Sequence, residues 1–587
     1  MASDAAPTEN GTAAFSLGDW SIDESKPIKV AVIGAGFSGI LAGIRFRQHI
    51  PNVSVTVYDK NAGVGGTWYT NRYPGLACDI PSHTYQYTFE PWTDWSAFYA
   101  PGPEIRAYLN RVVDKYKIRK HIKLQHEILH AHWDEPTAKW HIRVRRPKEG
   151  GSEGEFEEFE DIVDVLFAGM GSLSRWRWPN IGGLDKYQGK LIHPAQWDVA
   201  DDGKWEDGVK DWKDKKIAVI GAGSSALQLV PALQPHVSKL VNYVRGKTWI
   251  SVTFGGKTRG KLAPDGENYV FTDEDRRKFK DVEYYKEFRH GLEEEVNSVH
   301  LTTIKGSAMQ NGAREAFTQI MRKRLEKKPW IADHIIPDFP VACRRLTPGP
   351  GYLEALCEDN VEFVPKGIKS LTEKGLVTED GQTEDFDVII CATGYDTTFQ
   401  YPFPIIGRNG IALNDKWSPH PVTYLACCVD EFPNYFFSLG PNAAVGGGSL
   451  TAVIERQVDF AVRATRKLQR ERLRSIEVKE EALKDFDEYL ESYFPTTVYS
   501  EHCRSWYKAG KVDGRIIGLW PGSCMHAIRS LEQPRWEDFN YERDGNAKNR
   551  FHWLGDGSTH VEKHFVGEGA FYLTDPEIDV PPIPEDD

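Results

Sequence analysis

KVAVIGAGFSGI, residues Lys29–Ile40, recurs as KIAVIGAGSSAL, residues Lys216–Leu227. Each copy begins with a short apolar, β-branched run, which predicts a buried parallel strand, and continues through a glycine-rich turn into residues that can form a helix. The two copies lie too far apart to be units of a solenoid. The sequence therefore predicts an α/β protein with two separate Rossmann-like nucleotide-binding domains.

Two further apolar runs, Val165–Leu173 and Val388–Asp396, end in small residues, as expected where the chain crosses between domains beside a ligand. We therefore predict that the second nucleotide-binding domain is inserted into the first. Charged sequence compatible with helices predicts a small helical subdomain within this insertion. The predicted segments, in chain order, are a flexible N-terminal segment at 1–27, the first part of the first domain at 28–174, the second domain at 175–390 with its helical subdomain at about 268–335, the second part of the first domain at 391–575, and a flexible acidic tail at 576–587.

The first glycine-rich turn, GAGFSG, has the spacing of a dinucleotide-binding motif. Gly34 permits the tight turn, Gly36 lets a pyrophosphate approach the backbone, and Gly39 lets the helix pack close to the strand, so that the phosphates lie at the helix N-terminus. The next predicted strand ends in Asp59, whose carboxylate can accept hydrogen bonds from a ribose diol. The alternative interpretation is a glycine-rich turn that holds no ligand.

The second glycine-rich turn, GAGSSA, contains Gly221, Gly223 and Ala226, and the strand after it leads into Arg245 and Lys247. A carboxylate at this place would repel a 2′-phosphate, whereas an arginine can bind one through two hydrogen bonds. We therefore predict FAD at the first turn and NADPH at the second. The alternative for Arg245 and Lys247 is a pair of solvated surface charges.

Composition excludes several other classes of protein. A net charge of −13 argues against a general nucleic-acid binder. No stretch approaches the roughly 20 apolar residues of a membrane helix, and the N-terminus lacks the pattern of a signal peptide. Eight scattered cysteines without a CxxC pair predict reduced thiols in a cytosolic (cytoplasmic) enzyme. No metal site is predicted.

Two longer stretches carry a more specific resemblance. GGTWYTNRYPGLACD, Gly65–Asp79, resembles the motif GGxWxxxxYPGxxxD of Baeyer–Villiger monooxygenases, and YQGKLIHPAQWD, Tyr187–Asp198, resembles the fingerprint FxGxxxHxxxW[P/D] of their type I members. Tyr187 replaces the family's Phe, a conservative departure. Related flavin N- and S-oxygenases end the fingerprint in an aromatic residue followed by Lys or Arg, so Trp197 followed by Asp198 favours the carbonyl-oxidising branch. The resemblance covers roughly residues 28–560.

Other positions carry over from the same resemblance. CRRLTPG, Cys343–Gly349, resembles the segment that holds the family's active-site arginine, here Arg345, next to Arg344 as a cation for the NADP phosphate. SWY resembles a C-terminal stretch whose Trp, here Trp506, contacts the nicotinamide cofactor; the alternative for Trp506 is a core aromatic residue. His193 of the fingerprint is expected to act through linker geometry and is not predicted to be catalytic.

The two turns and the resemblance together predict three sets of site residues. The predicted FAD-binding residues are Gly34, Gly36, Ser38, Gly39, Asp59, Gly66, Thr67, Trp68, Asp79, Tyr85 and Gly394. The predicted NADPH-binding residues are Gly221, Gly223, Ser224, Ser225, Ala226, Arg245, Lys247, Arg344 and Trp506. The predicted catalytic residues are Arg345 and Asp79.

The resemblance implies that NADPH reduces FAD, and that the reduced flavin and dioxygen form a flavin peroxide, which inserts one oxygen atom next to a ketone carbonyl to give an ester or lactone. A peroxide anion needs a cation that cannot lose its proton, and only arginine qualifies near neutral pH. Arg345 is expected to stabilise this anion and the tetrahedral adduct. Asp79 is expected to hold Arg345 by an ion pair; the alternative is a structural N-cap.

Three other functions share parts of this pattern. A flavin monooxygenase that oxidises amines or sulfides uses the same two cofactors. A flavin disulfide reductase would need a redox-active cysteine pair beside the flavin, for which the vicinal Cys427 and Cys428 are a poor substitute. A flavoprotein that serves only as a binding partner would not need intact catalytic positions. The predicted partners are a small ketone and dioxygen, without nucleic acid or membrane, and no oligomeric state is predicted.

Overall fold

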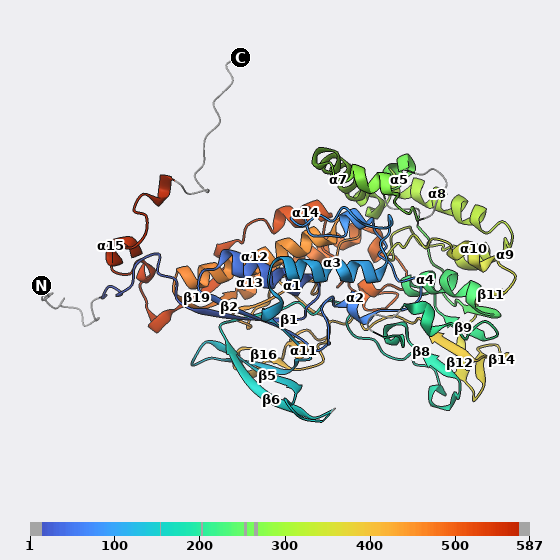
Figure 1. The fold of residues 1–587 in the computed structure, drawn as a ribbon, viewed down its shortest axis with the longest axis horizontal. Helices are drawn as coiled ribbons and strands as arrows, with labels where there is room; N and C mark the ends of the chain where they lie inside the picture. The colour runs from blue at the N-terminus through green and yellow to red at the C-terminus, as the bar shows by residue number, and fades with distance from the viewer. Residues whose placement is uncertain (1–14, 153, 201–203, 252–254, 263–267, 574–587) are drawn as a thin grey trace, which may run out of the picture.

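The computed structural model describes residues 15–152, 154–200, 204–251, 255–262 and 268–573 (Figure 1). The first of its sheets carries the first glycine-rich turn. Its strands, all paired in parallel, lie in the order β17 (Tyr435–Phe437), β7 (Val165–Ala168), β1 (Ile28–Ile33), β2 (Val53–Asp59) and β3 (Ile122–Leu124). Helices α1 (Phe37–His49) and α12 (Leu450–Arg470) pack against each other beside it. The apolar run of β1 is buried almost throughout, as expected for a parallel strand covered on both faces.

The second sheet carries the second glycine-rich turn and lies in the other half of the molecule (Figure 1). Its strands, again all parallel, lie in the order β11 (Val361–Val364), β10 (Lys239–Tyr243), β9 (Lys216–Ile220), β15 (Val388–Cys391) and β8 (Lys190–Ile192). Helices α4 (Ser224–Leu233) and α10 (Tyr352–Leu356) pack together on this sheet. The repeated sequence thus forms the same strand–turn–helix unit twice.

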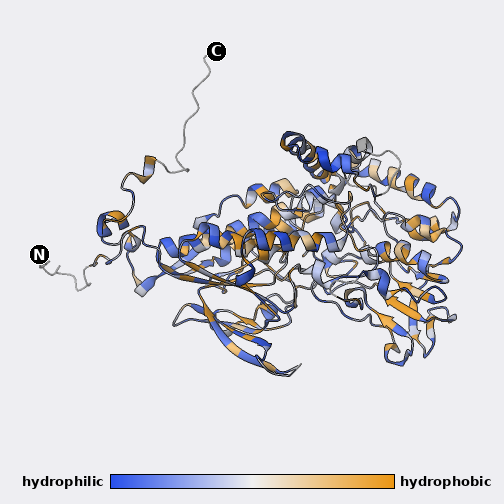
Figure 2. Ribbon diagram, viewed as in Figure 1, coloured by the Kyte–Doolittle hydropathy of each residue, from blue (hydrophilic) through white to orange (hydrophobic). Residues whose placement is uncertain are grey.

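The remaining described strands form three smaller sheets. An antiparallel sheet consists of β12 (Ile368–Leu371), β13 (Gly375–Thr378) and β14 (Thr383–Asp385). Another has the order β16 (Ile405–Ile406), β4 (Glu127–Asp134), β5 (Lys139–Pro147) and β6 (Phe156–Val163). The third pairs β18 (Leu473–Val478) with β19 (Phe539–Arg543). Figure 2 shows that β5 and β6, like the outer helices, carry both hydrophilic and hydrophobic colours.

The charged stretch before the arginine segment forms helices. They are α5 (Gly256–Leu262), α6 (Asp273–Lys278), α7 (Val282–Asn297), α8 (Ala308–Arg324) and α9 (Trp330–Ile335). Side chains of Thr272, Asp281 and Ser307 cap three of them by accepting backbone N–H groups. This region contacts residues that follow the first glycine-rich turn: α7 packs against Ser82–Thr84, and Phe98 donates its backbone N–H to the carbonyl of Tyr269, which lies between α5 and α6.

The two crossings between the sheets run beside each other. After β7 and after β15 the chain pairs at Trp176 and Tyr395, and the N–H of Asp396 donates to the carbonyl of Arg175 at 2.8 Å. The remaining described α-helices are α2 (Thr67–Thr70), α3 (Gly102–Lys115), α11 (Leu413–Lys416), α13 (Glu480–Tyr493), α14 (Cys524–Ser530) and α15 (His560–His564). Within the described ranges, no helix combines the length and apolar character that crossing a membrane requires.

Part of the N-terminal segment that was predicted to be flexible, 1–27, makes contacts with the C-terminal region. Ile22 donates its N–H to the carbonyl of Ser558 at 2.9 Å, and Asp556 donates to the carbonyl of Trp20 at 3.0 Å. Residues 1–14 lie outside the described residues. The C-terminal residues that order this segment lie more than 500 positions away, so local composition could not show the contact. The predicted flexible tail at 576–587 lies outside the described residues.

Candidate functional site

The first glycine-rich turn has room only for glycine at two places. Gly34 has φ +99°, and a Cβ there would lie 2.6 Å from the carbonyl oxygen of Gly169. A Cβ on Gly39 would lie 1.7 Å from the carbonyl oxygen of Gly34. Gly36 is the N-cap of α1. Gly66 has φ +56°, and a Cβ on Gly66 would lie 2.9 Å from the Cα of Gly36. Two glycine segments therefore meet at the N-terminus of α1, where backbone N–H groups favour an anion.

Asp59 lies beneath this turn. The residue is 6% exposed, and its side chain accepts hydrogen bonds from the N–H of Ala35 at 2.7 Å and from the N–H and side-chain amide of Asn61 at 2.8 and 2.9 Å. Burial raises the pKa of Asp59. The carboxylate thus holds the turn in place, and its two oxygens offer about four acceptor positions, more than these three donors use. Ser38 is buried against Ser438, with 3.0 Å between the two hydroxyl oxygens.

Asp79 and Arg345, 266 positions apart in sequence, form a bidentate ion pair. Nε and Nη2 of Arg345 donate to the two carboxylate oxygens of Asp79 at 2.9 and 2.6 Å. The charge of Asp79 raises the pKa of Arg345 above its ordinary value, so the guanidinium stays protonated. Among the described residues none accepts from Nη1, and 34% of the side chain is exposed. One edge of the guanidinium is held and the other is available to a ligand.

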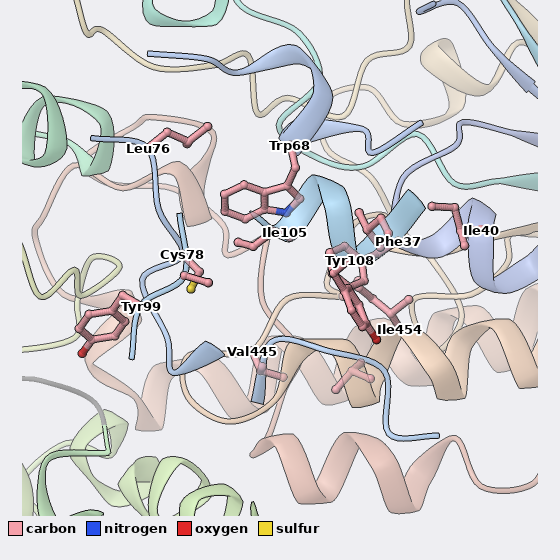
Figure 3. Packing of buried hydrophobic residues seen from close by; sticks show 14 of the residues in the cluster. Phe37, Ile40, Trp68, Leu76, Cys78, Tyr99, Ile105, Tyr108, Val445 and Ile454 are labelled. Atoms are coloured by element: carbon pink, nitrogen blue, oxygen red, sulfur yellow. The ribbon is translucent and has the colours of Figure 1, made fainter. Parts of the chain in front are cut away.

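The neighbours of Asp79 exclude the alternative of a helix N-cap. The helix that follows begins at Ser82, and its N-cap is Pro81. Cys78, directly before Asp79, lies in a hydrophobic cluster with Trp68 and Leu76, whose packing Figure 3 shows. This packing fixes the backbone that presents the carboxylate to Arg345.

Aromatic residues surround the ion pair. Trp68 Nε1–H donates to the hydroxyl of Tyr85 at 3.2 Å, and burial raises the pKa of Tyr85. Tyr507 is 2% exposed; burial raises its pKa to about 12, and the charges of Arg345 and Asp79 both act on it. Sequence reasoning missed Tyr507, although it directly follows Trp506. Trp506 is half-buried against the ring of Tyr507, with 4.6 Å between centroids, so its alternative as a core aromatic residue stays open.

The second glycine-rich turn is more open than the first. Gly221 has φ +123°, and a Cβ there would lie 2.4 Å from the carbonyl oxygen of Ala392. Gly223 is the N-cap of α4 and has no atom within 4 Å of the place of a Cβ, whereas Ala226 is fully buried. Space for a ligand therefore lies at Gly223, beside the N-terminus of α4.

Cations gather at the end of β10. Arg245 is exposed and Lys247 is half-buried in the loop after this strand. Arg344 Nη1 donates to the carbonyl oxygen of Lys247 at 2.8 Å, which joins the arginine segment to this loop. Burial lowers the pKa of Arg344, and the charge of Arg504 lowers it further. Repulsion of this kind favours an anionic ligand, since an anion would relieve it.

His193 binds the chain at Gly394, where it crosses between the two sheets. Its Nε2–H donates to the carbonyl of Gly394 at 3.2 Å, its Nδ1 accepts from the N–H of Ala195, and its ring stacks on Trp176 with 4.6 Å between centroids. Burial lowers the pKa of His193, so the ring is neutral near pH 7. Gly394 has φ +92° and no atom within 4 Å of the place of a Cβ. The histidine therefore fixes a backbone position, as expected for a linker residue.

One pair of cysteines corrects the prediction of reduced thiols. Cys343 and Cys503 form a disulfide with their Cα atoms 6.5 Å apart, while the other six cysteines are free and buried. The pair meets because Ala342, beside Cys343, and Tyr507 pack in one hydrophobic cluster. The cysteines lie 160 positions apart, and their spacing carries no sign of this packing.

Comparisons with known proteins agree with this geometry. A model of the NAD(P)-binding Rossmann-like domain matches residues 32–101. The chain is 40% identical to the FAD-binding monooxygenase tazF of Aspergillus terreus, over 94% of this chain and 97% of that protein. It is 35% identical to a Baeyer-Villiger monooxygenase of Pseudomonas aeruginosa, over 84% of this chain and 88% of that protein. The solved structure of an oxidised steroid monooxygenase bound to NADP superposes with a TM-score of 0.73 at 27% identity, over 88% of this chain and all of that one.

Proposed function

The chain belongs to the family of FAD-binding monooxygenases of the Baeyer–Villiger type, and we propose that it converts a ketone into an ester or lactone with FAD, NADPH and dioxygen. The reaction balances as ketone, dioxygen, NADPH and one proton giving ester, NADP⁺ and water. One oxygen atom enters the bond between the carbonyl carbon and its substituent, and the other leaves as water with the two electrons of NADPH. Bound FAD supplies the redox chemistry, and the protein positions the reactants.

The first glycine-rich turn fits FAD. Glycines at 34, 36 and 66 leave no side chain between the backbone and a pyrophosphate at the N-terminus of α1, and Asp59 lies at the end of the adjacent strand for a ribose diol. The residues proposed to bind FAD are Gly34, Gly36, Ser38, Gly39, Asp59, Gly66, Thr67, Trp68, Asp79, Tyr85 and Gly394.

The second glycine-rich turn fits NADPH. The open space at Gly223 supports a pyrophosphate there, and the cations Arg245, Lys247 and Arg344 support a 2′-phosphate at the end of β10. Ser224, Ser225 and Ala226 begin α4 and would present their backbone N–H groups. Gly221 provides the turn itself, and Trp506 remains a candidate contact for the nicotinamide.

The Arg345–Asp79 pair carries the proposal. Since Asp79 occupies Nε and Nη2, the free Nη1 can donate to an oxyanion, and the raised pKa of Arg345 means that it cannot neutralise this anion by giving up a proton. A permanent, oriented cation stabilises the negative charge that develops on the carbonyl oxygen when it is attacked. Buried aromatic residues around the pair exclude water and favour an apolar ketone.

Two variants of Arg345 test this role. Arg345→Ala should reduce ester formation by about 10²- to 10³-fold, while NADPH still bleaches the flavin under anaerobic conditions. Arg345→Lys keeps a charge but not the bidentate geometry, so it should fall between the wild type and the Ala variant. Ester formation at near wild-type rates in Arg345→Ala would refute the role.

Product identification separates the related reactions. The wild-type protein is incubated with NADPH and a panel of ketones that also contains a thioether, and products are identified by mass spectrometry. Lactones or esters support the proposal, whereas sulfoxide without any lactone assigns the chain to the amine- and sulfide-oxidising branch.

The domain division is proposed on the two sheets, with FAD bound by 28–174 and 391–575 and NADPH by 175–390; the cytosolic location stays a prediction.

A further inference from the structure

Helix α4, which follows the second glycine-rich turn, contacts both segments that carry the ion pair. One segment is the turn before Asp79, and the other is the loop after Arg345. These contacts come from Gln228 and Ser224, which lie one helical turn apart and therefore on the same face of α4. None of the site predictions from the sequence included Gln228.

Gln228 holds the segment before Asp79 through both ends of its amide. Its Oε1 accepts from the hydroxyl of Tyr73 at 2.9 Å, and its Nε2 donates to the carbonyl oxygen of Ala77 at 2.9 Å. The backbone approaches as closely: Gly75 has φ +75°, and a Cβ there would lie 2.5 Å from the carbonyl oxygen of Gln228. Ala77 is two residues before Asp79, so this contact sets where the carboxylate lies.

Ser224 holds the segment after Arg345. Its hydroxyl lies 2.9 Å from the hydroxyl of Thr347, two residues beyond Arg345. The backbone carbonyl of Thr347 accepts from the N–H of Ser251 at 2.9 Å, which anchors the same loop to the segment that follows β10. Gly349 of this loop packs on Leu227 of α4, with 3.5 Å between the place of its Cβ and Leu227 Cδ1.

These contacts and the ion pair close into a ring. From α4 the ring runs through Gln228 to Ala77 and Asp79, across the ion pair to Arg345, and through Thr347 back to Ser224. A displacement of α4 therefore moves both partners of the ion pair. The N-terminus of α4 is also the place where the pyrophosphate of the nicotinamide cofactor would bind.

We infer that Gln228 and Ser224 are positioning residues through which a dinucleotide bound at the N-terminus of α4 sets the geometry of the Arg345–Asp79 pair. What the pair does chemically rests on the proposed function, whereas the coupling itself requires only that NADP⁺ binds to α4. Because coupling is reciprocal, a change that frees the ion pair from α4 also weakens binding of the dinucleotide.

Gln228→Ala tests the inference, with Gln234→Ala as the matched control. Gln234 follows α4 directly and donates to Asn360 at 2.9 Å, away from the ion pair. We expect Gln228→Ala to weaken NADP⁺ binding to the oxidised holoenzyme about 5- to 10-fold by calorimetry, since it removes two hydrogen bonds. We also expect more of the consumed NADPH to yield hydrogen peroxide and less to yield ester, while Gln234→Ala keeps wild-type values.

Thr347→Val provides a second test that does not depend on the folding of the first variant. It keeps the shape of the side chain and removes only the hydroxyl that meets Ser224, so NADP⁺ binding should weaken about 2- to 5-fold. If the ring is one unit, the double variant Gln228→Ala/Thr347→Val loses less affinity than the product of the two single effects. If the two substitutions lower the NADP⁺ affinity independently, so that their effects multiply in the double variant, the contacts do not act as one ring and the inference is wrong.

The outcomes separate this inference from the proposed function. A wild-type protein that forms no ester from any ketone contradicts the proposed function, but the NADP⁺ affinities of the variants still test the ring. Wild-type NADP⁺ affinity and wild-type peroxide release in Gln228→Ala, with only a lowered melting temperature, would show a purely structural contact and overturn the inference.

Discussion

Glu293→Gln should make the protein more stable at pH 8 and leave it nearly unchanged at pH 4. Glu293 lies half-buried on α7, and within the described part of the chain no residue gives it a hydrogen bond or an ion pair. Burial raises the pKa of its carboxyl from 4.5 to about 7; Arg289 acts in the opposite direction, and Glu455 adds to the increase. Between about pH 4.5 and pH 7, the carboxyl of Glu293 therefore keeps its proton in the folded protein and releases it in the unfolded chain.

The sign and size of the effect follow from this difference. The carboxyl contributes its full stability below about pH 4.5, the unfolded value, and this contribution is lost as pH rises through about 7, the folded value. At about 1.4 kcal/mol per pH unit, the difference in free energy of unfolding is about 3 kcal/mol at most. Partial exposure reduces it to about 1–2 kcal/mol. A neutral amide of the same size avoids this penalty above pH 7.

Thermal unfolding of the holoprotein at a fixed scan rate, followed by circular dichroism, measures the effect. The melting temperature of Glu293→Gln should exceed that of the wild type by about 1–2 °C at pH 8, because the entropy of unfolding grows with chain length, and the difference should nearly vanish at pH 4. Glu294→Gln removes the same charge from the exposed neighbour on α7 and serves as the control. An equal difference at both pH values, or the same increase in Glu294→Gln, would refute the reasoning.

Two further predictions concern the cofactor and the cross-link. Arg245→Ala should raise the KM for NADPH about 10- to 100-fold, because a charge-assisted contact to the 2′-phosphate is lost, and should leave the KM for NADH unchanged in steady-state assays; equal changes for both would contradict the assignment. Alkylation of the denatured protein without reductant should label six of the eight cysteines, and all eight after reduction, by mass spectrometry. Eight labels without reductant would show that Cys343 and Cys503 are not joined.

Both strand–turn–helix units could be predicted because their signals are local. The backbone has a positive φ at positions 34 and 221, which favours glycine, and the turn that sets this angle spans only a few residues. The apolar strands before these turns also differ in sequence from the charged helical stretch. Arg345 and Asp79 were found by resemblance to motifs. The geometry could not be predicted in the same way: the side chain of Asp59, expected to face a ribose, also binds the N–H of Ala35 beneath the turn.

The residues that the sequence missed depend on contacts between distant segments. Gln228 looks like any polar residue on an amphipathic helix, and its role appears only when Tyr73 and Ala77 lie against it. Tyr507 becomes part of the site because its segment packs on the arginine loop. Such contacts depend on how whole elements pack, which no short window of sequence contains.

The sequence by itself determined the two nucleotide-binding units, their order and the residue types at each turn, because backbone sterics and apolar periodicity act over a few neighbouring residues. Only the tertiary structure decided that Asp79 grips one edge of Arg345, that Cys343 meets Cys503, and that α4 touches both sides of the ion pair. The physical reason is that these pairs are separated by 120 residues or more, so their contacts form only when segments far apart in the sequence pack together.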